Sequence, residues 1–80
     1  MRNNNNHHFE TTDLRLATFL YASGVKLQGL DHSNPRAVFI FDEPNQELLA
    51  NFQAGTAMIN VFAYDNARNT LMAKLQGREP

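Results

Sequence analysis

Three histidines and one pair of carboxylates are the residues of this chain whose types could do chemistry. His7, His8 and His32 could bind a divalent metal, because neutral imidazoles are good ligands. Asp42 and Glu43 could hold magnesium or exchange protons with a substrate. The histidine pair, however, stands in an asparagine-rich stretch, and adjacent carboxylates at a strand end point in different directions. We expect no metal site and interpret the carboxylates as candidates for capping the helix that follows.

The other chemical patterns in the sequence are incomplete. Ser23 and Ser33 have no base and no orienting acid placed to activate a hydroxyl nucleophile. Gly24 and Gly29 stand in no phosphate-loop pattern and are interpreted as structural. The sequence therefore predicts a protein that is not an enzyme and that has no catalytic, cofactor-binding or metal-binding residues.

Composition narrows the class of protein. The chain has 80 residues, which fit one domain, and its 42% hydrophobic content with six Phe suffices for a core. It has no Cys, which excludes a disulfide framework and favours a reducing, cytoplasmic compartment. A net charge of −1 and a pI near 6.2 give no overall attraction to nucleic acid or to an anionic membrane. No stretch approaches the roughly 20 apolar residues of a membrane span.

We divide the chain into three parts. Residues 1–9 contain four consecutive Asn and two His, and we expect them to form a disordered arm. Residues 77–80 are expected to be a frayed end. Between them, residues 10–76 form one predicted domain, because no internal repeat and no linker divides them.

Hydrophobic spacing predicts three helices and two strands within this domain. The first element is a helix over 12–23, capped by Thr11 or Thr12 and closed by Gly24. Two strands follow, over 25–30 and 36–41. The second helix is capped by Asp42 or Glu43, has Pro44 in its first turn and is closed by Gly55, and the third helix covers 61–76 with Asn60 as its cap. The residues between the strands are dense in turn formers, which predicts a hairpin. The order α-β-β-α-α indicates a small α+β domain in which an antiparallel hairpin packs on helices.

The second predicted strand is apolar on both faces. Ala37, Phe39 and Phe41 alternate with Val38 and Ile40, so that one set faces the helices and the other set lies on the opposite face. An exposed apolar strand of this kind favours aggregation. Two arrangements remain open: the third helix covers Val38 and Ile40, or a twofold homodimer buries that face or extends the sheet. Val38 and Ile40 are therefore the candidate dimer or partner interface.

Several blocks of the sequence resemble a family of short prokaryotic and phage proteins of unknown function. They are the stretch from Thr12 to Leu20 (TDLRLATFL), then Gly24, Leu27 and Gly29, then the strand from Val38 to Asp42 (VFIFD), and finally Phe62, Tyr64, Ala67 and Leu71. The similarity covers residues 10–76 and consists of capping, glycine and core positions. The resemblance implies no activity, cofactor or catalytic residue. It implies only that such genes often sit in mobile or phage-like settings.

Three functions are consistent with these features. The favoured one is a non-catalytic protein-interaction module that acts as a homodimer and binds an unidentified protein partner. The first alternative is a nucleic-acid-binding accessory protein, because Lys26, Gln28 and Arg36 can share one face of the hairpin, although Asp31 and Asp42 lie at the same edges. The second alternative is a small-ligand-binding domain, for which so short a chain offers little room beside its core.

Overall fold

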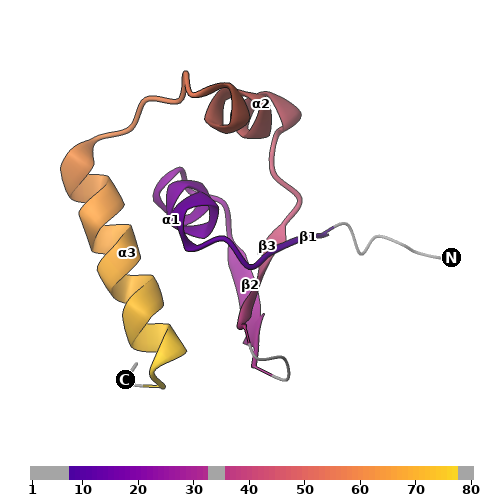
Figure 1. The fold of residues 1–80 in the computed structure, drawn as a ribbon, viewed down its shortest axis with the longest axis vertical. Coiled ribbons are helices and arrows are strands. Elements are labelled where there is room, and N and C mark those ends of the chain that lie inside the picture. Colours follow the sequence, from indigo (N-terminus) through magenta and orange to yellow (C-terminus); the bar gives the residue numbers. More distant parts are fainter. Residues whose placement is uncertain (1–7, 33–35, 78–80) are drawn as a thin grey trace, which may run out of the picture.

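A three-stranded antiparallel sheet and three helices make up the fold (Figure 1). The computed structural model describes residues 8–32 and 36–77. In chain order the elements are β1 (His8–Thr11), α1 (Leu14–Ala22), β2 (Leu27–Asp31), β3 (Val38–Asp42), α2 (Gln46–Ala54) and α3 (Val61–Leu75). The predicted α+β class and the order α-β-β-α-α are confirmed, with one strand added in front. None of the helices in the described part of the chain combines the length and the apolar character that crossing a membrane requires.

The added strand, β1, forms one edge of the sheet, whose order is β1-β3-β2. Phe9 lies beside Phe41 of the central strand β3. The prediction of a disordered arm is therefore wrong for His8 and Phe9, because both belong to β1. A strand of four residues with a single large apolar side chain shows too few alternations to be predicted from spacing. The rest of the predicted arm, residues 1–7, and residues 78–80 of the predicted frayed end lie outside the described residues.

The predicted hairpin is present as the antiparallel pair β2 and β3. Each strand begins two residues later and ends one residue later than its predicted range. The pairing register shifts between Leu27 and Gly29, so that Gln28 is an extra residue on β2. Such a bulge bends an edge strand and increases its twist.

Helix α1 begins at a cap supplied by Asp13. One carboxylate oxygen of Asp13 accepts the backbone N–H groups of Arg15 at 2.9 Å and Leu16 at 3.4 Å. The predicted cap at Thr11 or Thr12 is wrong, because β1 extends through Thr11 and the helix begins only after the chain leaves the sheet. The Thr11 hydroxyl instead accepts the N–H of Asp13 at 3.0 Å, which fixes the turn between the two elements.

Helix α2 begins at Asn45. The Asn45 side-chain oxygen accepts the N–H of Glu47 at 2.7 Å. The predicted cap at Asp42 or Glu43 is wrong, because β3 runs through Asp42 and Pro44 precedes the cap instead of occupying the first turn. Asparagine is as good a capping residue as aspartate, and Asn45 stands three residues after Asp42.

Other helix ends match the sequence pattern. Gly24 follows α1 with φ of +94°, and Gly55 ends α2 with φ of +77°. Both angles lie in the left-handed region that glycine adopts without strain. Asn60 caps α3 by accepting the N–H of Phe62 at 2.8 Å and of Ala63 at 3.1 Å. The predicted roles of Gly24 and Gly55 at the C-terminal ends of α1 and α2, and of Asn60 at the N-terminal end of α3, are therefore confirmed.

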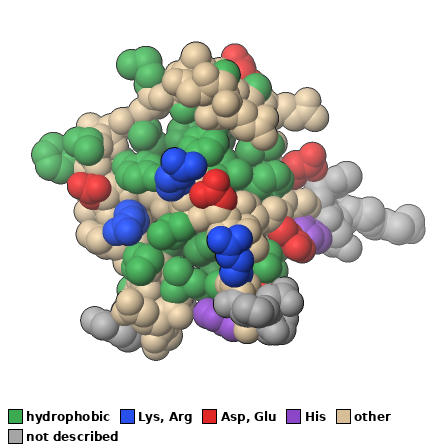
Figure 2. All heavy atoms as spheres, viewed as in Figure 1, with side chains coloured by type: hydrophobic (Ala, Val, Ile, Leu, Met, Phe, Trp, Pro, Cys, Tyr) green, Lys and Arg blue, Asp and Glu red, His purple; other side chains and the backbone are tan. Residues whose placement is uncertain are grey.

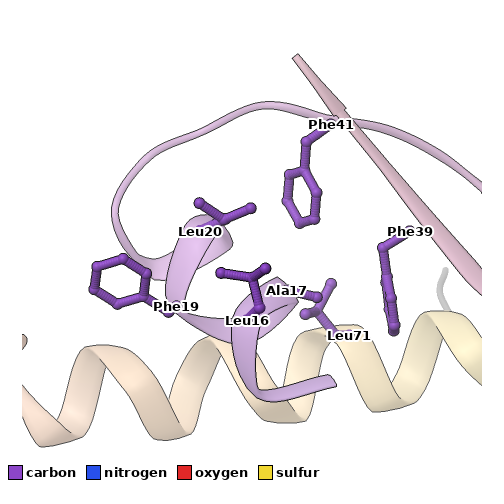
Figure 3. Close-up of a cluster of buried hydrophobic side chains, with 7 residues drawn as sticks. All are labelled: Leu16, Ala17, Phe19, Leu20, Phe39, Phe41 and Leu71. Carbon is purple, nitrogen blue, oxygen red and sulfur yellow. The ribbon is translucent and has the colours of Figure 1, made fainter. Parts of the chain in front are cut away.

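The core lies between the sheet and α1, and α3 packs against α1 from its other side (Figure 1). Side chains fill the space between these elements, and many of those visible there are hydrophobic (Figure 2). The buried cluster consists of Leu16, Ala17, Phe19, Leu20, Phe39, Phe41 and Leu71 (Figure 3). Helix α1 contributes five buried residues and α2 contributes none. Helix α2 therefore packs on the core only through half-buried side chains such as Leu48, Leu49 and Phe52.

Candidate interaction surfaces

The residues considered for metal binding are spread over the described structure. His8 lies on β1 with its Nε2 atom 2.9 Å from a carboxylate oxygen of Glu10. His32 is exposed just beyond β2, and His7 lies outside the described residues. Among residues 8–32 and 36–77, no three His, Asp or Glu side chains form a group that could hold a metal ion. This part of the chain therefore offers no set of ligands from which to build a metal site.

The polar residues considered for nucleic-acid binding are mixed with carboxylates. The Gln28 amide nitrogen donates to a carboxylate oxygen of Asp42 at 2.6 Å. Lys26 is exposed immediately before β2, and its carbonyl oxygen accepts the N–H of Asp42 at 2.9 Å. Arg36 is exposed before β3. The structure thus brings Gln28 and Lys26 next to a negative charge, which opposes the approach of a phosphate to these two residues.

The outer face of the sheet, the face opposite α1, carries Val38 and Ile40. Both residues are half-buried, whereas Phe39 and Phe41 point from β3 into the core (Figure 3). Leu71 of α3 belongs to the same core cluster as Phe39 and Phe41. The arrangement in which the third helix covers Val38 and Ile40 is therefore wrong, because α3 lies on the other side of the sheet.

Polar residues surround these two side chains on the outer face. The register places Glu10 beside Ile40 and Asp31 beside Val38. A cavity of about 420 Å³ at this edge is lined by Glu10, Thr11, Thr12 and Val38. An antiparallel sheet with one face on the core and one face toward water usually shows this mixture. The outer face is therefore only partly apolar.

A second surface lies where α2 is joined to α3, and we call residues 55–62 the elbow. Three large apolar side chains of the elbow are exposed: Met58 at 93%, Val61 at 63% and Phe62 at 75%. The position of Phe62 follows from the register of α3. Tyr64 packs against the core, and Phe62 stands two residues before it, about 200° away around the helix axis. The Phe62 ring is therefore directed away from the core.

The elbow belongs to a long stretch of sequence without charge. Residues 48–64 contain no Asp, Glu, Lys, Arg or His, although charged residues make up 19% of the chain. Figure 2 shows Lys and Arg side chains over the middle and lower part of the visible face and none over its upper end, where α2 lies. The polar side chains of this stretch, such as Asn51 and Thr56, are uncharged, and the Thr56 hydroxyl bonds to Asn51. The elbow itself therefore combines apolar exposure with a lack of charged side chains, and the exposed Asp65 follows it one turn along α3.

An apolar cavity of about 250 Å³ adjoins the elbow. Its lining comes from α1, α2, α3 and the loop between the last two: Phe19, Phe52, Gly55, Ala57, Ile59 and Tyr64. The Phe19 and Phe52 rings are tilted, with their centres 5.3 Å apart, in the range of a favourable aromatic pair. Phe52 stays half-buried because no further element covers it among the described residues. The cavity thus exposes aromatic surface on the side of α3 that carries Tyr64.

Two apolar residues of the elbow, Met58 and Phe62, could have been recognised from the sequence as an exposed surface. Phe62 is one of the positions that carry the family resemblance, and Met58 lies outside every predicted helix and strand. Neither residue fits the inward stripe of α3, and the charge-free stretch 48–64 surrounds both. Apolar residues outside a predicted core stripe, in a segment without charge, mark an exposed apolar surface.

Comparison with known proteins gives one match. The family described as a domain of unknown function (DUF5659) matches residues 6–74. Neither a curated protein nor a solved structure matches the chain. The matched range includes β1 and all three helices, so it covers almost the whole described fold.

Proposed function

The chain belongs to the DUF5659 family, whose function is unknown, and we propose that it is a non-catalytic protein-interaction module that acts as a homodimer. The observation that carries the proposal is the exposure of three large apolar side chains, Met58, Val61 and Phe62, within five positions. Single exposed apolar residues are common on soluble proteins, but three large ones so close together in the chain favour a binding surface. The absence of charge over residues 48–64 supports a protein partner over a nucleic acid, which needs cations to contact its phosphates.

The setting of this module is part of the proposal. The chain acts in the cytoplasm of a prokaryote, where a protein without Cys loses nothing to reducing conditions. Its gene lies in a mobile or phage-like context, as the sequence resemblance implies. An unidentified protein is bound by the homodimer.

Size-exclusion chromatography with light scattering tests the homodimer directly. We expect a single species at twice the 9.1 kDa chain mass, unchanged between low and high salt, because an apolar interface is little affected by ionic strength. Absorbance at 260 and 280 nm is recorded in the same run, since a chain with no Trp and two Tyr absorbs weakly and bound nucleic acid would dominate the signal. A monomer at all concentrations would contradict the homodimer. An excess at 260 nm that disappears in high salt would favour the nucleic-acid alternative.

A further inference from the structure

We infer that two copies of the chain join their β1 edges as an antiparallel pair, with a twofold axis at Phe9, so that their sheets become one continuous sheet. This inference rests on the proposed homodimer and assigns its interface. It differs from the sequence prediction, which placed the interface at Val38 and Ile40. The elbow of each copy stays available to the unidentified protein partner.

The sheet has two edge strands, and β2 is the one less suited to pairing. Proteins protect an edge strand with a bulge, with Lys or Pro, or by placing other elements beside it. β2 carries the bulge at Gln28, and Lys74 of α3 lines a cavity of about 350 Å³ together with residues 27–30. A strand added to β2 would therefore meet an irregular backbone and a neighbouring helix.

The other edge strand, β1, has none of these protective features. Its residues His8–Thr11 contain neither Lys nor Pro, and its pairing with β3 shows no shift in register. Among the described residues no strand lies on its other side. Figure 1 shows β1 on the side of the fold away from α3, so a second copy at this edge leaves α3 uncovered. β1 is thus the edge that can accept a further strand.

Symmetry restricts the register in which two β1 strands can pair. The twofold axis of an antiparallel pair is perpendicular to the sheet and keeps the helices of both copies on one face. Residues opposite each other then point to the same face, so the axis passes through a residue that meets its own copy. An axis at Glu10 would place two carboxylates opposite each other, which is unfavourable. An axis at Phe9 places Glu10 of each copy opposite His8 of the other.

Charge complementarity between His8 and Glu10 favours a second copy as the partner. Both residues lie on the outer face, because they alternate with Phe9, which packs against the core. Their side chains are 40% and 53% exposed, and they already form a pair within one strand, with 2.9 Å between Nε2 and a carboxylate oxygen. A protonated imidazole has two N–H donors, so His8 can hold Glu10 of its own strand and of the second copy. Asp42, beside His8 on β3, adds to the negative charge around the ring.

Phe9 supplies the apolar contact at the axis. It is half-buried in the single chain and lies beside Phe41 of β3. In the pair, the two Phe9 rings lie opposite each other on the face that carries the helices, and aromatic pairs of this kind stabilise sheets. Backbone hydrogen bonds and the Phe9 rings hold the two copies together, whereas the charged pairs select the register. The dimer is therefore expected to persist in high salt.

Cysteine cross-linking tests this register, because the chain has no Cys of its own. His8→Cys and Glu10→Cys each replace an exposed side chain, so the core stays intact. We expect a disulfide-linked dimer when the two variants are mixed, allowed to exchange subunits and oxidised, since residues 8 and 10 lie directly opposite. Either variant alone should give at least about tenfold less, because like positions are offset by two residues along the strands. Glu47→Cys, exposed on α2, is the matched control and should not link to His8→Cys.

Light scattering over a range of concentrations adds a second measurement. Glu10→Lys places a cation opposite His8 twice in each dimer, so the dissociation constant should rise at least about tenfold. Glu47→Lys makes the same change of charge on α2 and should leave the dissociation constant unchanged. Adding His8→Glu to Glu10→Lys restores opposite charges and should recover most of the affinity. Circular dichroism confirms that each variant is folded.

The outcomes separate the interface from the homodimer. Cross-links formed by Glu10→Cys alone, or a dimer as tight in Glu10→Lys as in the unchanged chain, would overturn the β1 interface and leave the homodimer standing. A monomeric unchanged chain would overturn the proposed homodimer itself.

Discussion

Phe39 and Phe62 show how differently one residue type is used in this chain. Phe39 is 2% exposed at the centre of the core, whereas Phe62 is 75% exposed at the elbow. Helical and strand spacing predicted the inward positions of Leu16, Phe19 and Phe39 correctly, because each belongs to an element with a clear period. Spacing says less about Phe62, since an apolar residue off the stripe has no partner in its own element.

The two phenylalanines give a stability prediction at the scale of one residue. Phe39→Ala should lower the free energy of unfolding by about 3–5 kcal/mol, because it removes a buried ring and leaves a cavity. Phe62→Ala is the matched control and should change it by less than about 0.5 kcal/mol in the monomer. Urea denaturation at a concentration below dimer formation measures both. Equal effects of the two substitutions would show that Phe39 is not a core residue.

At the scale of elements, the helices were easier to predict than the strand β1. The three helices have nine to fifteen residues, over which an apolar stripe repeats several times. β1 has four residues and is held by its pairing with β3, a long-range contact that no local pattern records. The missed strand also explains the misplaced cap, because a chain that leaves the sheet at Thr11 begins its helix at Asp13.

The position of this cap leads to a prediction at the element scale. Asp13→Ala should destabilise the protein by about 1 kcal/mol, since it leaves the N–H groups of Arg15 and Leu16 without their carboxylate. Thr12→Ala, which changes the adjacent exposed residue, should cost much less. Asp13→Asn should retain most of the stability, because asparagine caps equally well. Thermal unfolding followed by circular dichroism ranks the three variants, and a larger loss in Thr12→Ala than in Asp13→Ala would place the cap one residue earlier.

At the scale of the whole molecule, packing is uneven between the two ends. α1 lies between the sheet and α3 with five buried residues, while α2 has none and borders the cavity beside the elbow. Local opening costs least where few apolar contacts hold an element. A surface that is apolar, uncharged and loosely packed gains order as well as burial when a partner covers it. The elbow thus adjoins a helix that contributes no buried residue to the core.

Hydrogen exchange tests this uneven packing and the β1 interface. In dilute protein the amides of α2 should exchange at least about tenfold faster than those of α1, because α2 opens without disrupting the core. At concentrations that favour the dimer, protection should rise in β1 and stay constant in residues 48–64, since the second copy covers only the β1 edge. Nuclear magnetic resonance at each of two protein concentrations measures the amide exchange rates of both regions in the same spectra. Added protection confined to residues 48–64 would move the interface to the elbow, and equal protection of α1 and α2 in dilute protein would show that the two ends are packed alike.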